Sequence, residues 1–103
     1  MKLSELKTIN IEAKEYFDSI NANSYYKSKI ILNKDFKNKE IFIIPFTAGY
    51  ERQYLFDSLN LISSLYPNSK WNKENLSLWQ LENIYKLKIK YNIKKDCKKS
   101  ELT

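Results

Sequence analysis

The sequence is poor in several residues on which enzymes and metal sites depend. Its 103 residues include no histidine, one cysteine (Cys97) and one glycine (Gly49). Without histidine, the chain has no Ser-His or Cys-His nucleophile pair, and a zinc site built on histidine or on a cysteine cluster is excluded. A single glycine cannot form a P-loop or a G-x-G-x-x-G turn. A single cysteine cannot close an internal disulfide, so nothing indicates an oxidising compartment.

Long apolar segments are also absent. The longest apolar run, Ile41–Phe46, is much shorter than the ~20 residues that span a bilayer. Residues Met1–Asn10 lack the apolar region that a signal peptide needs. We therefore expect a soluble, cytoplasmic protein of one domain that carries no cofactor and no metal.

The chain has an excess of positive charge, and most of it lies near the C-terminus. The formal net charge is +6, and residues 86–103 contribute seven lysines against two acidic residues. We expect a domain over residues 1–93 and a basic, flexible tail over 94–103 that attracts phosphate or an acidic surface. A solvated terminus that only aids solubility is the alternative. A/T-rich codon usage, which favours lysine, asparagine, isoleucine and tyrosine, would also account for part of the lysine excess.

Alternation of apolar and polar residues predicts a strand near the start of the chain. Residues 9–13 alternate in this way, although Ala13, Phe17 and Ile20 also have the spacing of one helical face. We favour the strand. Residues 19–23 contain two asparagines and suit a hairpin connection, because asparagine tolerates left-handed backbone conformations.

Two further strands are predicted in the next part of the chain. Residues 25–32 and 40–46 are rich in β-branched and aromatic side chains, and the polar segment between them contains Asp35 and Asn38. The two segments therefore form a hairpin. Pro45 has no amide proton to donate, so it belongs at the end of its strand or on an edge of the sheet.

Helical spacing replaces the alternation after Gly49, whose freedom permits a sharp turn. Leu55, Leu59 and Ile62 lie on one helical stripe, and Pro67 closes this helix at about residue 65.

A second helix begins at Ser77, which forms a capping box with Gln80. Its apolar stripe, with the staple residues Leu76 and Leu81, continues to about Asn92. The order is thus β-β-β-α-α: an α+β fold in which two helices pack on one face of a three-stranded antiparallel sheet.

One candidate site follows from the alternation of the second strand. Tyr25, Lys27 and Lys29 share the face of the sheet turned away from the helices with Lys14 and Tyr16 of the first strand. Rings and ammonium groups on one sheet face can stack bases and contact phosphates. The plain alternative is that cross-strand tyrosines only stabilise the sheet, at ~0.2–1 kcal/mol per pair. The same face would also suit a protein partner.

Two other patterns in the sequence offer candidate sites. Tyr50 and Arg52 flank the predicted start of a helix, where free amides can bind an anion, although Gly49 and Tyr50 also fit a simple turn that covers the core. The E-x-K pattern of Glu12 and Lys14 is typical of metal-dependent nucleases, but the upstream aspartate that this chemistry requires is missing. The sequence therefore gives little support to metal-dependent cleavage.

Part of the chain, residues 11–65, resembles small accessory proteins carried by phages and mobile elements. The shared features are Tyr16-Phe17-Asp18, Asn21–Tyr25, Pro45-Phe46, and Gly49-Tyr50 with Tyr54 before a leucine-rich helix. Ala22 stands where that turn often has glycine. The resemblance implies an accessory role in the host-cell cytoplasm, such as anti-CRISPR-like inhibition of a host defence nucleoprotein complex. It carries over no catalytic residue.

These observations lead to a non-catalytic protein that acts by binding a host protein or ribonucleoprotein complex, with RNA or DNA as a direct partner in the alternative. The residues expected to contact a protein partner are Tyr16, Tyr25, Lys27, Lys29, Tyr50 and Arg52. Those expected to bind nucleic acid directly are Lys14, Lys27, Lys29, Lys94, Lys95, Lys98 and Lys99. A small metal-independent nuclease is the third hypothesis, and it names no catalytic residue.

Overall fold

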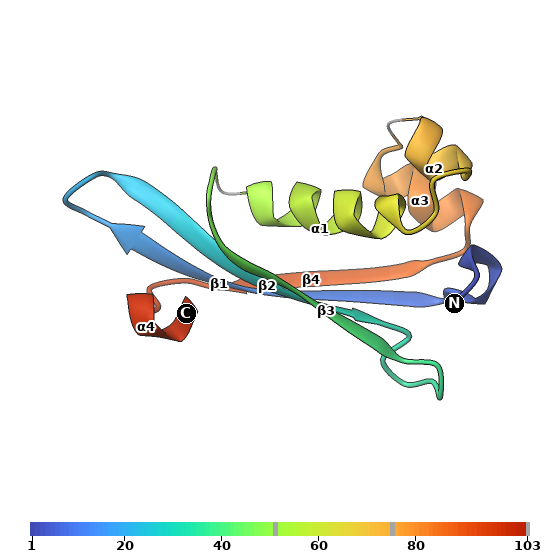
Figure 1. The fold of residues 1–103 in the computed structure, drawn as a ribbon, viewed down its shortest axis with the longest axis horizontal. Helices are drawn as coiled ribbons and strands as arrows, with labels where there is room; N and C mark the ends of the chain where they lie inside the picture. The colour runs from blue at the N-terminus through green and yellow to red at the C-terminus, as the bar shows by residue number, and fades with distance from the viewer. Residues whose placement is uncertain (51, 75, 103) are drawn as a thin grey trace.

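The computed structural model describes residues 1–50, 52–74 and 76–102, which form an α+β fold around one mixed sheet. The elements follow in the order η1 (Leu3–Glu5), β1 (Thr8–Asp18), β2 (Asn23–Leu32), β3 (Glu40–Ala48), α1 (Gln53–Ser64), α2 (Lys70–Lys73), α3 (Leu78–Ile84), β4 (Lys88–Lys94) and α4 (Lys99–Leu102). Helices α1, α2 and α3 lie on one face of the sheet, and α4 lies on the other (Figure 1). We call the face that carries α4 the open face.

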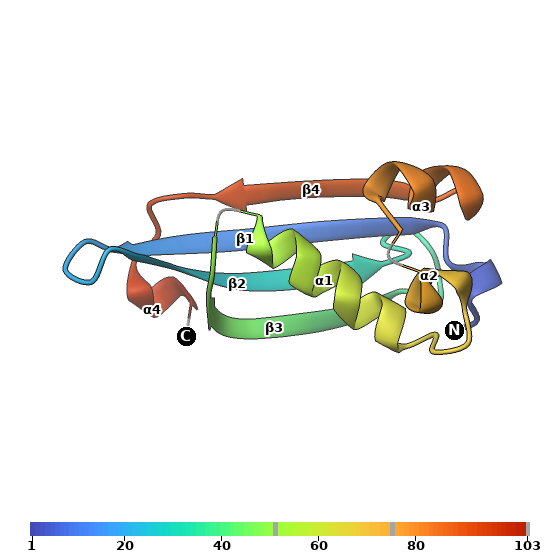
Figure 2. The ribbon, with the colours of Figure 1, turned by 90° about the horizontal axis from the view of Figure 1, so that it is seen from above.

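The sheet has the strand order β3-β2-β1-β4 (Figure 2). Strands β1, β2 and β3 pair antiparallel, as the sequence predicts, and the first segment is a strand rather than a helix. Strand β4 pairs parallel to β1, so the sheet is mixed and has one strand more than expected. Pro45 lies in β3, an edge strand, where its missing amide proton costs no sheet hydrogen bond.

The predicted second helix is wrong beyond residue 84. Helix α3 begins with the expected capping box of Ser77 and Gln80 but ends at Ile84. Lys86 then has a φ of 56°, a left-handed conformation that turns the chain out of the helix. Residues 88–94 form β4, because Ile89 and Ile93 pack against the core while Lys88, Lys90 and Lys94 are exposed on the alternate positions.

Part of the segment 94–103, for which the sequence predicts a flexible tail, contacts the sheet: Lys94 ends β4, and Lys99–Leu102 form α4. The backbone amide of Cys97 donates a hydrogen bond to the carbonyl oxygen of Glu15, 3.0 Å away. Cys97 and Leu102 are both buried, and they lie outside the main core under the helices. The buried side chains of Cys97 and Leu102 thus hold α4 on the open face.

The main core lies between the sheet and α1 to α3. It combines the inward-facing residues of β1 and β2 with Leu55 and Ile62 of α1, Trp71 of α2 and Leu81 of α3. Burial of these side chains is what fixes the helices on this face, since apolar area removed from water supplies most of the stabilisation. Among the described helices, none is long and apolar enough to cross a membrane.

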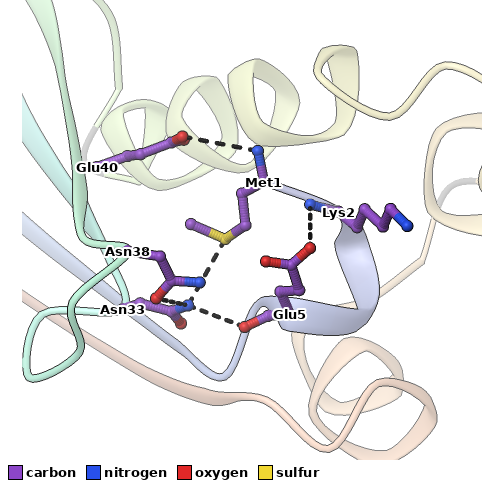
Figure 3. Close-up of polar contacts among 6 residues, drawn as sticks. All are labelled: Met1, Lys2, Glu5, Asn33, Asn38 and Glu40. Carbon is purple, nitrogen blue, oxygen red and sulfur yellow. Dashed lines mark hydrogen bonds and ion pairs between the residues drawn. The ribbon is translucent and has the colours of Figure 1, made fainter.

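A fully buried asparagine ties the start of the chain to the β2–β3 connection (Figure 3). The side-chain oxygen of Asn33 accepts hydrogen bonds from the amides of Lys7 (2.7 Å) and Thr8 (3.1 Å). Its amide nitrogen donates to the carbonyl oxygen of Glu5 (2.9 Å) and to Asn38 Oδ1 (3.1 Å). Asn33 also has a φ of 52°, which asparagine adopts more readily than most residues. One side chain therefore fixes where β1 begins.

Gly49 makes the turn from β3 into α1, for a reason other than the one expected. Its φ is not in the left-handed region. A Cβ atom at this position would instead lie 2.6 Å from Cβ of Gln53, at the start of α1. The glycine is needed because the helix approaches the strand end closely.

Candidate functional site

The open face carries a row of lysines that three strands bring together. Lys14 of β1 lies directly beside Lys27 of β2 and Lys94 of β4 in the register of the sheet. We call Lys27, Lys14 and Lys94 the lysine row. Side chains at such positions have Cβ atoms about 5 Å apart, and like charges placed there repel each other. The row therefore lowers the stability of the sheet unless an anion binds to it.

The neighbouring row contains a mixture of charges. Glu12 lies between Lys29 of β2 and Asn92 of β4. Together with α4, these two rows enclose an open hollow of about 460 Å³, whose charged lining consists of Lys14, Lys27, Lys29, Lys94, Glu12 and Glu101. Positive groups outnumber negative ones in this hollow by two to one, so it favours an anionic ligand.

The lysines of the hollow are poorly neutralised. Lys94 Nζ lies 3.6 Å from Oε1 of Glu101, on α4. Within the described part of the chain, Lys14, Lys27 and Lys29 have no carboxylate within 4.0 Å. The pKa of Glu101 lies below its ordinary value, first because its carboxylate accepts a hydrogen bond from the Lys98 amide, and further because Lys94 and Lys14 are near.

Three aromatic rings lie beside the lysine row, across β1, β2 and β3. The rings of Tyr16 and Tyr25 stack with centroids 6.2 Å apart, and those of Tyr25 and Phe46 with centroids 4.6 Å apart. Tyr25 has a neighbouring ring on each side, so a nucleobase would have to stack on an outer face, of Tyr16 or of Phe46. The ladder stabilises the sheet in any case.

Phe46 reaches this ladder through a β-bulge that the sequence did not reveal. Tyr26 pairs with Thr47 and Ser28 pairs with Ile44, so two residues of β3 lie opposite Lys27 alone. The extra residue changes the alternation of β3, and Phe46 stacks on the ring of Tyr25.

The structure places the predicted partner-binding residues at three separate positions. Tyr16, Tyr25, Lys27 and Lys29 belong to the open face, as the alternation predicts. Arg52 lies on the other side of the sheet, in a hollow of about 440 Å³ between α1 and the α2–α3 region. Tyr50 is 88% exposed and lines a third hollow, which lies beside the β1–β2 hairpin. These two residues do not share a surface with the lysine row.

The predicted tail lysines also have different positions. Lys94 belongs to the lysine row. Lys95 lines the same hollow as Tyr50, and Lys98 and Lys99 are exposed at the start of α4. Lys88 and Lys90, which we expected in a helix, join the open face instead. Their alternation with isoleucine and tyrosine in residues 88–94 is the signal that identifies them.

The structure also shows where the remaining sequence patterns lie. The described residues contain no group of three or more His, Cys, Asp or Glu side chains that could hold a metal ion. Glu12 and Lys14 of the E-x-K pattern line the same hollow, Lys14 in the lysine row and Glu12 in the neighbouring row. The thiol of Cys97 is buried, with Sγ 3.3 Å from the carbonyl oxygen of Lys94.

Comparison with known proteins assigns this chain to no family and no fold. No protein-family model, no curated protein and no solved structure matches the chain. The chemistry of the open face is therefore the basis on which a function is inferred.

Proposed function

We propose that this protein acts by binding, without catalysis, and that the lysine row of its open face contacts the phosphates of a single-stranded nucleic acid. The observation that carries the proposal is the row itself: Lys27, Lys14 and Lys94 lie side by side on three adjacent strands. Adjacent ammonium groups cost stability in the free protein. A bound phosphate removes that cost and releases counterions as it binds.

The extent of the basic surface supports a chain of phosphates over a single small anion. Lys88, Lys90 and Lys94 project from β4 on the same face as the row. They cover about 20 Å of strand, at ~3.3 Å per residue. A single phosphate would occupy only one end of this distance, whereas a polynucleotide would use all of it.

Two further features support a single strand over a duplex. The rings of Tyr16 and Phe46 lie next to the lysine row, and each has an outer face not covered by Tyr25. Unstacked bases bind such rings, at about 1–3 kcal/mol per base, and bases inside a duplex are not available to them. Helix α4 also lies against the open face (Figure 1), where a single strand needs less space beside it than a double helix does.

The test is fluorescence anisotropy with a labelled 12-nucleotide RNA and its DNA equivalent, measured over a range of salt concentrations. Lys14→Gln, Lys27→Gln and Lys94→Gln should each weaken binding several-fold and reduce the slope of log K against log salt by about 1. Lys73→Gln is the matched control, since Lys73 is exposed on α2 and removes the same charge from the opposite side of the sheet. The labelled strand should stay intact throughout.

A second measurement makes the test sharper. Because Lys14 repels both neighbours in the free protein, Lys14→Gln should raise the free energy of unfolding by a few tenths of a kcal/mol while it weakens binding. Loss of binding together with a gain in stability excludes misfolding as the cause. Absence of binding at low salt, or an equal loss in Lys73→Gln, would refute the proposal.

Inhibition of a host defence nucleoprotein, which the sequence resemblance implies, stays a prediction. On the proposal made here, such an inhibitor would use the lysine row against the RNA of its target. Affinity purification from host cells with wild-type protein and with Lys14→Gln would test this: a ribonucleoprotein recovered equally with both would contradict it.

A further inference from the structure

The C-terminal helix places a carboxylate among the lysines of the open face. Glu101 lines the same hollow as Lys14, Lys27 and Lys29, and its Oε1 forms the ion pair with Lys94. Glu101 and Glu12 are the two acidic side chains that line this hollow. Unlike Glu12, which is fixed within β1, Glu101 comes from a separate element, α4, that lies against the open face of the sheet (Figure 1).

We propose that Glu101 is an internal competitor for the nucleic-acid site. In the free protein its carboxylate forms an ion pair with Lys94. When a nucleic acid binds, one of its phosphates displaces the carboxylate and forms the ion pair with Lys94 instead. The C-terminal helix therefore sets the affinity of the open face and raises its selectivity for ligands with enough charge to break the pair. This inference rests on the proposed function.

The way α4 is held suits such an exchange. Its anchors are the buried side chains of Cys97 and Leu102, which do not depend on Glu101. The ion pair itself is exposed, with 68% of the Lys94 side chain and 34% of the Glu101 side chain accessible to solvent. Exposed pairs of this kind contribute little to stability and are weakened by salt. A phosphate can therefore displace the carboxylate while the helix stays attached.

The substitution Glu101→Gln removes the negative charge of this side chain while it keeps the hydrogen bond that positions the side chain. Glu101 Oε2 accepts a hydrogen bond from the Lys98 amide at 2.7 Å, the backward contact of a capping box. Glutamine makes the same contact with its amide oxygen and carries no charge. Glu82→Gln is the matched control, because Glu82 is exposed on α3, on the other side of the sheet.

The experiment measures the affinity of wild type, Glu101→Gln and Glu82→Gln for the same labelled RNA at low salt. We expect Glu101→Gln to bind about two- to fivefold more tightly, the factor set by the loss of one exposed ion pair. Glu82→Gln should change affinity less, because its charge is screened over the greater distance. Equal affinities for the two variants, with wild-type binding intact, would overturn the inference and leave the proposed function standing.

A spectroscopic measurement distinguishes the remaining outcomes. Carbon-detected NMR follows the side-chain carboxyl of Glu101 while RNA, or inorganic tripolyphosphate, is added. Displacement from Lys94 should move the pKa of Glu101 back toward its ordinary value. If tripolyphosphate produces this change and RNA does not bind, Glu101 competes with phosphate for Lys94, but the proposed nucleic-acid function is wrong. If neither ligand changes the Glu101 signal, the inference is wrong.

Discussion

Replacement of Asn33 by alanine should be among the most destabilising single changes in this protein. Asn33 is fully buried, and its side chain bonds two backbone amides, those of Lys7 and Thr8, together with the carbonyl oxygen of Glu5. Alanine leaves all three backbone groups without that partner. Each lost hydrogen bond costs about 1 kcal/mol, and more where the group stays out of water.

The backbone conformation adds to this loss. Asn33 has a φ of 52°, and the left-handed region costs alanine roughly 1–2 kcal/mol. The total for Asn33→Ala is therefore about 4–5 kcal/mol, a large part of the ~5–15 kcal/mol that stabilises a typical domain. Asn33→Gly loses the same hydrogen bonds without the strain and should be about 1 kcal/mol less damaging. Asn38→Ala loses a single contact, at an exposed residue, and should cost less than about 1 kcal/mol.

Urea unfolding followed by tryptophan fluorescence measures these differences, with the slope m checked for constancy across the three variants. The expected order of stability is Asn38→Ala, then Asn33→Gly, then Asn33→Ala. An Asn33→Ala variant as stable as Asn38→Ala would show that the buried network does not fix the start of β1. If the glycine and alanine variants are equally unstable, the contribution assigned to strain is wrong.

Three further changes test other parts of the fold. Gly49→Ala should cost about 1–3 kcal/mol in thermal unfolding, because its new Cβ meets Cγ and Cβ of Gln53, 2.5 and 2.6 Å away. Adding Gln53→Ala should restore only part of this loss, because it removes Cγ and leaves Cβ in place. Lys86→Gly should leave the midpoint of urea unfolding unchanged or raise stability by up to ~1 kcal/mol, because glycine adopts the φ of 56° freely. Hydrogen bonds from Asn21 lower the pKa of Asp18 from 3.8, so the stabilisation that its carboxylate gives the folded state is complete above pH 3.8 and is lost as pH falls through the lowered value. The melting temperature below pH 3.8 should therefore depend less on pH in Asp18→Asn than in wild type.

The antiparallel half of the sheet was predictable because its signals are local. Alternation defines the faces of β1 and β2, and the hairpin turn has its own chemistry: Asp18 accepts hydrogen bonds from the amides of Ile20 and Asn21, and Ala22 takes a φ of 54°. The same alternation placed Tyr25, Lys27 and Lys29 on the face where the structure has them. Faces of a strand follow from the sequence whenever the register of neighbouring strands is set by a short turn.

The fourth strand was not predictable from the same signals. Residues 81–91 contain a helical stripe that overlaps the alternation of residues 88–94, and only pairing with β1 decides between them. Nothing local indicates that Lys86 adopts a left-handed conformation, because lysine seldom does. The lysine row was therefore only partly visible: Lys14 and Lys27 were placed together, while the position of Lys94 beside them depends on a contact between distant parts of the chain.

That parallel pairing determines when the open face is complete during synthesis. A ribosome releases β1, β2 and β3 long before β4, and each of those strands finds its partner through a hairpin. One edge of β1 stays unpaired until β4 has been synthesised. The pairing of β1 with β4 joins residues about 80 positions apart, and contacts of such high sequence separation form slowly. The lysine row gains Lys94 only through this pairing, so a chain that has not yet formed β4 presents Lys14 and Lys27 without their third lysine.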